Sequence, residues 1–118
     1  MQAIRLVTLS LALLWGTASA QAHAYLDHAS PLVGSTVTSA PSEVRMWFTQ
    51  ALEPRFTAAQ LRSSTGAVVA SGGVDPADPK QMVIQVRALP PGKYKVFWKV
   101  LSVDTHRSEG SFGFEVKP

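Results

Sequence analysis

The stretch KYKVFWKVLSVD, residues 93–104, decides the fold class of this chain of 118 residues. Apolar side chains recur in it at every second position, which is the period of a β-strand with one buried face. Because Lys95 and Lys99 would be costly to bury, the opposite row is the expected core face: Tyr94, Val96, Trp98 and Val100. The stretch therefore predicts a long strand that lies over a hydrophobic core.

Shorter stretches with the same period lie on both sides of it. VRMWFTQAL (44–52), QMVIQVRAL (81–89) and SFGFEVKP (111–118) place apolar side chains at alternate positions, and AAQLRSSTGAVVAS (58–71) predicts two strands around a turn at 64–66. GGVDPADP (72–79) is expected to be a loop because of its Gly, Pro and Asp content. The expected inward-facing residues are Val44, Met46 and Phe48, then Met82, Ile84 and Val86, and then Phe112, Phe114 and Val116.

These strands predict the fold class. After Pro31, no window of about 11 residues keeps apolar side chains at helical spacing. Short strands between turns indicate an all-β domain, a small antiparallel Greek-key β-sandwich or barrel. LPPGKYKVFW (89–98) also resembles the corner of many immunoglobulin-like domains, where a tyrosine shortly after a Pro-Gly turn packs at the sheet edge. A fold of this kind names no function.

The start of the chain has the layout of a secretory signal. Arg5 precedes an apolar run at residues 6–15, and small residues follow. The run is too short to span a bilayer comfortably. Cleavage after Ala20 or after Ala22 would satisfy the small-x-small rule, so the mature chain starts at Gln21 or at His23. We expect a soluble product in the periplasm or outside the cell.

Composition excludes some functions. There is no cysteine, so we expect neither disulfides nor thiolate metal sites, and any metal must take nitrogen, oxygen or thioether ligands. Without Arg5, the 11 Lys and Arg fall to ten against eight Asp and Glu, a formal net charge of +2 spread along the sequence. This charge is too small and too diffuse to predict binding to nucleic acid.

His23 is the first candidate metal ligand. As the first residue it would offer the α-amine and the imidazole Nδ1, which close a six-membered chelate ring on a metal. Reference pKa values of about 7.7–8.0 for the amine and about 6.5 for the imidazole allow both to lose their protons near neutral pH. The alternative is a loose terminal histidine without a ligand role.

Asp104 and His106 form the second candidate. They lie two residues apart at the end of the long strand, so in extended backbone their side chains would leave the same face. With the chelate at His23 they would give three nitrogens and one oxygen, a set that suits tetragonal Cu(II). The alternative is a surface salt bridge or a turn cap. His28 is expected to face solvent, with an accessory metal contact as its alternative.

The residues match a known family from His23 to Pro118. HAYLDHASPLVGSTV, VRMWFTQAL, DPKQMVI and LPPGKYKVFWKVLSVDTHRSEGSFGFEV resemble the sequence of the CopC family of periplasmic copper-binding proteins. The resemblance implies a cupredoxin-like or immunoglobulin-like β-barrel and one Cu(II) per chain, held by His23, Asp104 and His106. It favours cleavage after Ala22, which gives a signal peptide at residues 1–22 and a copper-binding domain at residues 23–118.

The sequence departs from the family in two respects. Some members hold Cu(I) in a methionine-rich loop with a histidine, but residues 63–80 contain neither Met nor His, so we expect no such site. Relatives can have a glutamate near the copper where this chain has Gln50, and an amide there would bring no charge.

Met46 and Met82 fall on apolar strand faces and are expected in the core.

Three functions remain open. The favoured one is a monomeric periplasmic Cu(II) carrier or buffer that sequesters copper or passes it to an inner-membrane copper transporter. The second is a metal-free interaction module of immunoglobulin-like fold. The third is a copper oxygenase with an N-terminal histidine brace, which we disfavour because no second catalytic group is evident and Asp104 would occupy a position an oxidase needs open. We therefore expect no enzymatic activity.

Overall fold

The computed structural model describes residues 24–118, and this part of the chain is all-β. Eight strands and one turn of 3₁₀ helix follow one another along it: β1 (Leu26–Ser30), β2 (Thr36–Val37), β3 (Glu43–Phe48), η2 (Pro54–Phe56), β4 (Ala58–Ser63), β5 (Val68–Asp75), β6 (Asp78–Gln85), β7 (Gly92–Leu101) and β8 (Arg107–Val116). No helix within residues 24–118 has the length and apolar character needed to cross a membrane.

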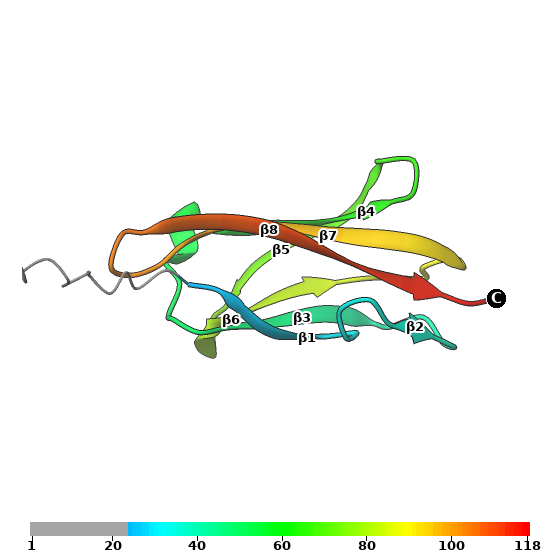
Figure 1. The fold of residues 1–118 in the computed structure, drawn as a ribbon, viewed down its shortest axis with the longest axis horizontal. Helices are drawn as coiled ribbons and strands as arrows, with labels where there is room; N and C mark the ends of the chain where they lie inside the picture. The colour runs from blue at the N-terminus through cyan, green and yellow to red at the C-terminus, as the bar shows by residue number, and fades with distance from the viewer. Residues whose placement is uncertain (1–23) are drawn as a thin grey trace, which may run out of the picture.

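The strands form one curled sheet that folds into two layers. Their order is β1-β3-β6-β5-β4-β7-β8-β2, so β3 pairs with β6 and β4 pairs with β7 across chain crossovers. In Figure 1, β4, β7 and β8 lie above β1, β3 and β6, and β5 connects the layers by pairing with both β4 and β6. The pairs are antiparallel except for the two-residue β2, which runs parallel to β8. The predicted Greek-key sandwich is confirmed.

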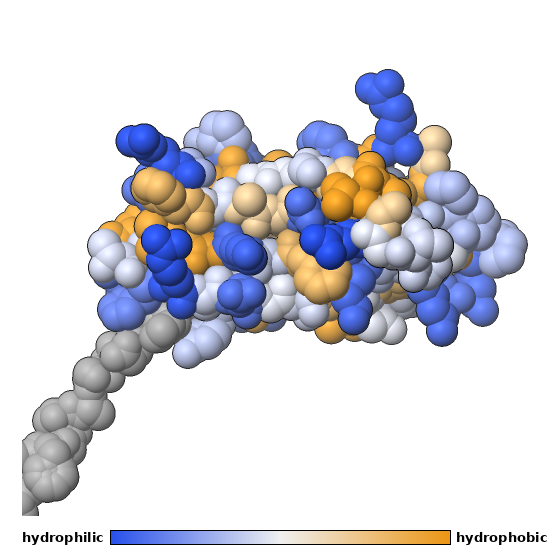
Figure 2. Space-filling model, turned by 90° about the horizontal axis from the view of Figure 1, so that it is seen from above, coloured by the Kyte–Doolittle hydropathy of each residue, from blue (hydrophilic) through white to orange (hydrophobic). Residues whose placement is uncertain are grey.

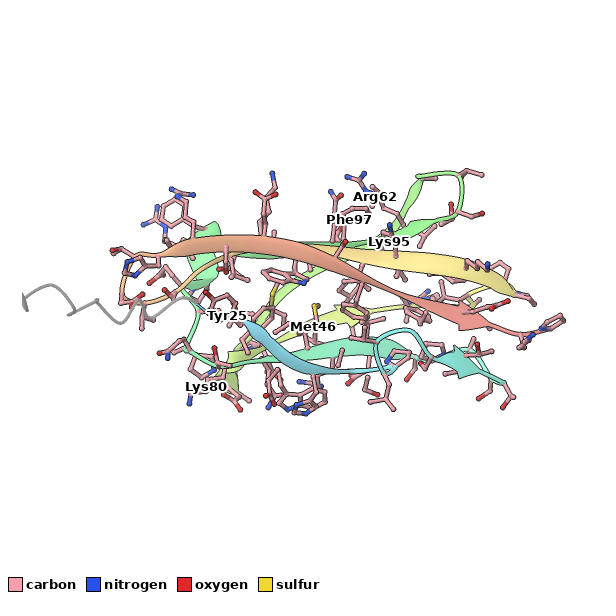
Figure 3. All side chains as sticks on the ribbon, viewed as in Figure 1. Tyr25, Met46, Arg62, Lys80, Lys95 and Phe97 are labelled. Atoms are coloured by element: carbon pink, nitrogen blue, oxygen red, sulfur yellow. The ribbon has the colours of Figure 1, made fainter. Side chains whose placement is uncertain are left out.

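The core lies between the layers and consists of the predicted rows. Tyr94, Val96, Trp98 and Val100 are all buried, whereas Lys95 and Lys99 face solvent. Met46 and Met82 are opposite one another in the β3–β6 register and have no exposed surface. The prediction that both methionines fill the core is confirmed, and Figure 3 shows Met46 between the layers.

The prediction of a loop at residues 72–79 is wrong. β5 runs to Asp75 and β6 begins at Asp78, so only Pro76 and Ala77 connect them. Gly72 pairs with Ile84, and a Cβ on Gly72 would lie 2.0 Å from the carbonyl oxygen of Val83. The glycines that indicated a loop therefore serve a close approach between two strands.

The turn into β7 holds the tyrosine expected from the sequence. Tyr94 is buried, and its hydroxyl donates a hydrogen bond to the carbonyl of Pro90. This contact is typical of the tyrosine corner of immunoglobulin-like sandwiches. It fixes the start of the β7–β8 hairpin, whose connecting loop lies at the opposite end of the sandwich from the C-terminus (Figure 1).

Candidate metal centre

The loop between β7 and β8, residues 102–106, carries two of the three predicted ligands. Its ends are held by the amide of Ser102, which donates to the carbonyl of His106 at 2.9 Å, and by the amide of Thr105, which donates to the carbonyl of Ser102 at 2.8 Å. Val103 donates to the carbonyl of Ala51 at 3.1 Å. The loop is thus fastened both to itself and to the segment before η2.

Asp104 and His106 are brought together in this loop. The Oδ1 atom of Asp104 lies 3.2 Å from Nδ1 of His106, and the side chains are 36% and 40% exposed. The expectation of extended backbone is wrong, because β7 ends at Leu101 and Thr105 adopts a φ of 74°. A turn with a left-handed residue at Thr105, rather than strand pleating, makes the pair meet.

Ser102 positions the Asp104 carboxylate. Its side chain is buried, and its hydroxyl donates to Oδ1 of Asp104 while accepting the backbone amide of His106 at 3.3 Å. The Ser102 hydrogen bond lowers the pKa of Asp104 below its ordinary value, and the neighbouring His106 lowers it further. Asp104 is therefore a carboxylate at neutral pH, the form in which it can bind a cation.

The first described residue lies beside this loop. Ala24 is fully buried, and its carbonyl accepts a hydrogen bond from Oγ of Ser108 at 2.7 Å, two residues beyond His106. Tyr25 is fastened to Thr49 by a pair of hydrogen bonds, of 3.0 Å from its amide and 2.9 Å to its carbonyl. Figure 3 shows Tyr25 at the end of the sandwich that carries the β7–β8 loop.

His23 lies outside the described residues, so its role as a ligand stays a prediction. Within residues 24–118, no group of three or more His, Cys, Asp or Glu is gathered closely enough to hold a metal ion. Of the three predicted ligands, the described part of the chain contains Asp104 and His106, and these two lie together.

His28 does not belong to this cluster. Its ring stacks on Trp47 with the centroids 4.4 Å apart, and its Nδ1 lies 2.7 Å from Oδ2 of Asp27. The side chain is 53% exposed, which confirms the prediction that it faces solvent. Gln50 is half-buried in the bend after β3.

Sequence reasoning did not single out Ser102 and Ser108 as residues of this site. Ser102 lies two residues before Asp104, but this spacing alone does not indicate a hydrogen bond between them. Ser108 had no signal, because its contact with Ala24 joins residues 84 positions apart.

Comparison with known proteins gives a consistent result. The CopC domain model matches residues 26–117. Copper resistance protein C from Escherichia coli is 38% identical over 108 residues, covering 84% of this chain and 85% of that protein.

Two solved structures share the fold. CopC from Methylosinus trichosporium OB3b superposes with a TM-score of 0.76 at 31% identity, covering 81% of this chain and 95% of that one. PcoC from Escherichia coli, described as a methionine-rich copper resistance protein, gives a TM-score of 0.72 at 36% identity, covering 81% and 100%. Sequence and fold thus agree over almost all the described residues, and the chain belongs to the CopC family.

Proposed function

We propose that this protein binds one Cu(II) ion per chain through His23, Asp104 and His106. The observation that carries the proposal is the juxtaposition of the Asp104–His106 pair with the anchored Ala24. The carbonyl of Ala24, the residue that follows His23 in the sequence, is bound by Ser108 on β8, two residues after His106.

The donor set suits this metal. The amine and imidazole of an N-terminal His23 with the imidazole of His106 and the Asp104 carboxylate make three nitrogens and one oxygen. Such a set favours tetragonal Cu(II), which also stands highest in the Irving–Williams order. The buried Met46 and Met82 leave no thioether on the described surface for Cu(I).

The biological role in this proposal is carriage of copper, not catalysis. The signal-like residues 1–22 support a periplasmic location for the mature chain, and the similarity to proteins named for copper resistance supports a role in copper homeostasis. A monomeric carrier of this kind sequesters Cu(II) or passes it to an inner-membrane copper transporter.

The test compares chains that begin at His23 and at Gln21, each titrated with Cu(II) and followed by EPR and calorimetry. The His23 chain should bind one Cu(II) with nitrogen couplings in an axial spectrum, whereas the Gln21 chain, whose His23 amine is in a peptide bond, should bind much more weakly. His106→Ala should abolish the same signal, and His28→Ala is the matched control that should leave it intact.

Acidification supplies a second readout. At about pH 4, well below the imidazole reference pKa of about 6.5, protons should displace the metal. Equal affinities of the two chains, or retention of Cu(II) by His106→Ala, would contradict the proposed ligand set.

A further inference from the structure

The outer face of β4 and β7 gathers cations that are spread out in the sequence. Lys93, Lys95 and Lys99 alternate along the solvent side of β7, and Arg62 joins them from β4. Within residues 24–118 none of these four takes part in an ion pair, whereas Arg45 on the other layer pairs with both Glu43 and Asp75. We call Arg62, Lys93, Lys95 and Lys99, with Phe97 among them, the cationic face. Figure 2 looks onto the sandwich from this side.

Two of these cations oppose one another directly. Arg62 and Lys95 are cross-strand partners in the β4–β7 register, and both lie over the ring of Phe97, at 4.8 Å and 5.8 Å from its centroid. Like charges in directly opposite positions destabilise a sheet. Figure 3 shows Arg62, Lys95 and Phe97 pointing together away from the sandwich.

The guanidinium of Arg62 is ordered by Gln60. Oε1 of Gln60 accepts hydrogen bonds from its Nε at 3.2 Å and its Nη2 at 2.8 Å, which fixes the guanidinium over Phe97 and leaves Nη1 for another acceptor. An ordered guanidinium loses less entropy when it binds a carboxylate.

A pocket of about 290 Å³ opens beside this pair. It has three cations and the hydroxyls of two serines in its wall, and no acidic residue among the side chains that line it: Arg62, Ser63, Ser64, Lys93, Tyr94, Lys95 and Phe97. Its lining is therefore suited to carboxylates from outside the described chain.

We propose that the cationic face docks an extended, acidic segment of a partner protein. Residues two apart on a strand are about 6.6 Å apart, so glutamates at alternate positions of an extended segment match Lys93 and Lys95. The row from Lys93 to Lys99 covers about 20 Å, which is longer than any single small anion.

A protein segment fits this face better than an anionic bilayer. Glu109 and Glu115 on β8 are the cross-strand partners of Lys99 and Lys93. A flat negative surface would cover these carboxylates as well, whereas a single extended segment that lies along β4 and β7, on the side away from β8, does not have to cover them. Phe97 is only 37% exposed and lies beneath Arg62, so it is not available for insertion into lipid. This inference does not rest on copper binding.

The test uses a fluorescent synthetic peptide with glutamate alternating with threonine, and a second peptide with glutamine in place of glutamate. The parent protein should bind the first peptide and not the second. Arg62→Gln combined with Lys95→Gln should weaken binding about tenfold or more, which is the loss of one good charge contact. Lys80→Gln combined with Arg87→Gln removes the same charge from elsewhere and should change binding by less than about twofold.

Amide chemical shifts of the parent protein should move on β4 and β7 when the glutamate peptide binds. Equal losses in the two double variants, or no binding by the parent, would overturn the proposal. So would phosphatidylglycerol vesicles that bind the parent through Arg62 and Lys95 while the peptide does not. Both double variants should bind Cu(II) like the parent, so this test can fail independently of the metal site.

Discussion

The hydroxyl of Ser108 holds the carbonyl of Ala24 at 2.7 Å, and this contact joins the start of the described chain to the strand that follows His106. Ala24 has no exposed surface, so this hydrogen bond is shielded from water. The contact therefore fastens Ala24 to β8 two residues beyond His106.

Ser108→Ala should weaken Cu(II) binding. Loss of this hydrogen bond costs about 0.5–1.5 kcal/mol, which corresponds to roughly a twofold to 13-fold fall in affinity when that energy orders the N-terminal ligand. Competition titration against a copper chelator measures the change. Ser111→Ala, on the exposed side of the same strand, is the control, and an equal effect there would show that Ser108 has no special role.

Ser102→Ala should release the Asp104 carboxylate. Groups that orient a metal ligand typically contribute tenfold to 100-fold in affinity, so we expect a loss of about this size with a broadened EPR spectrum. Ser102→Thr keeps the hydroxyl and should restore most of the affinity. If alanine and threonine variants bind alike, the hydroxyl does not position Asp104.

The ion pair between Arg45 and Asp75 should make stability depend on pH. The pKa of Asp75 lies below its ordinary value, first because the amide of Ala77 donates to it and then because Arg45 lies 2.6 Å away. The unfolded value is about 3.9, so this stabilisation is complete above about pH 4 and is lost as the pH falls through the lower folded value.

Asp75→Asn tests this dependence in the metal-free protein. The variant should be less stable than the parent at neutral pH. The difference should shrink at about pH 3, below the unfolded pKa of about 3.9, because protonation of Asp75 then favours the unfolded chain. Urea unfolding at the two pH values measures both quantities. A difference that stays constant between them would rule out the ionised carboxylate as its source.

Gly110→Ala should destabilise the fold. A Cβ at Gly110 would lie 2.5 Å from Cζ2 of Trp98, whose indole is packed edge-on to Phe48. Such overpacking costs about 1–3 kcal/mol. Gly73→Ala is the matched control, because its Cβ would meet nothing nearer than 3.8 Å and should leave the midpoint of urea unfolding unchanged or slightly raised.

The core could be predicted from the sequence because strand pleating is a local rule. Alternation alone placed Val96 and Trp98 inside and Lys95 and Lys99 outside. The same rule failed at Asp104 and His106, where a positive φ at a β-branched residue, Thr105, changes the chain direction. A local sequence pattern cannot predict such a conformation, because tertiary contacts of the loop hold it in place.

The cationic face shows the other limit. Its four cations are spread along the chain, and only the pairing of β4 with β7 puts Arg62 opposite Lys95. Register between strands distant in sequence is a property of the whole fold. Charge counts along a sequence therefore underestimate charge density on a sheet.

The burial of Met46 and Met82 has a consequence for oxidative damage. Both sulfurs are enclosed between the layers, so peroxide can reach them only when the sandwich opens. Methionine sulfoxide should accumulate at these positions at a rate set by opening of the fold rather than by the chemistry of the thioether. Sulfoxide formation at these two residues therefore reports how often the fold opens, and mass spectrometry can measure it without a label.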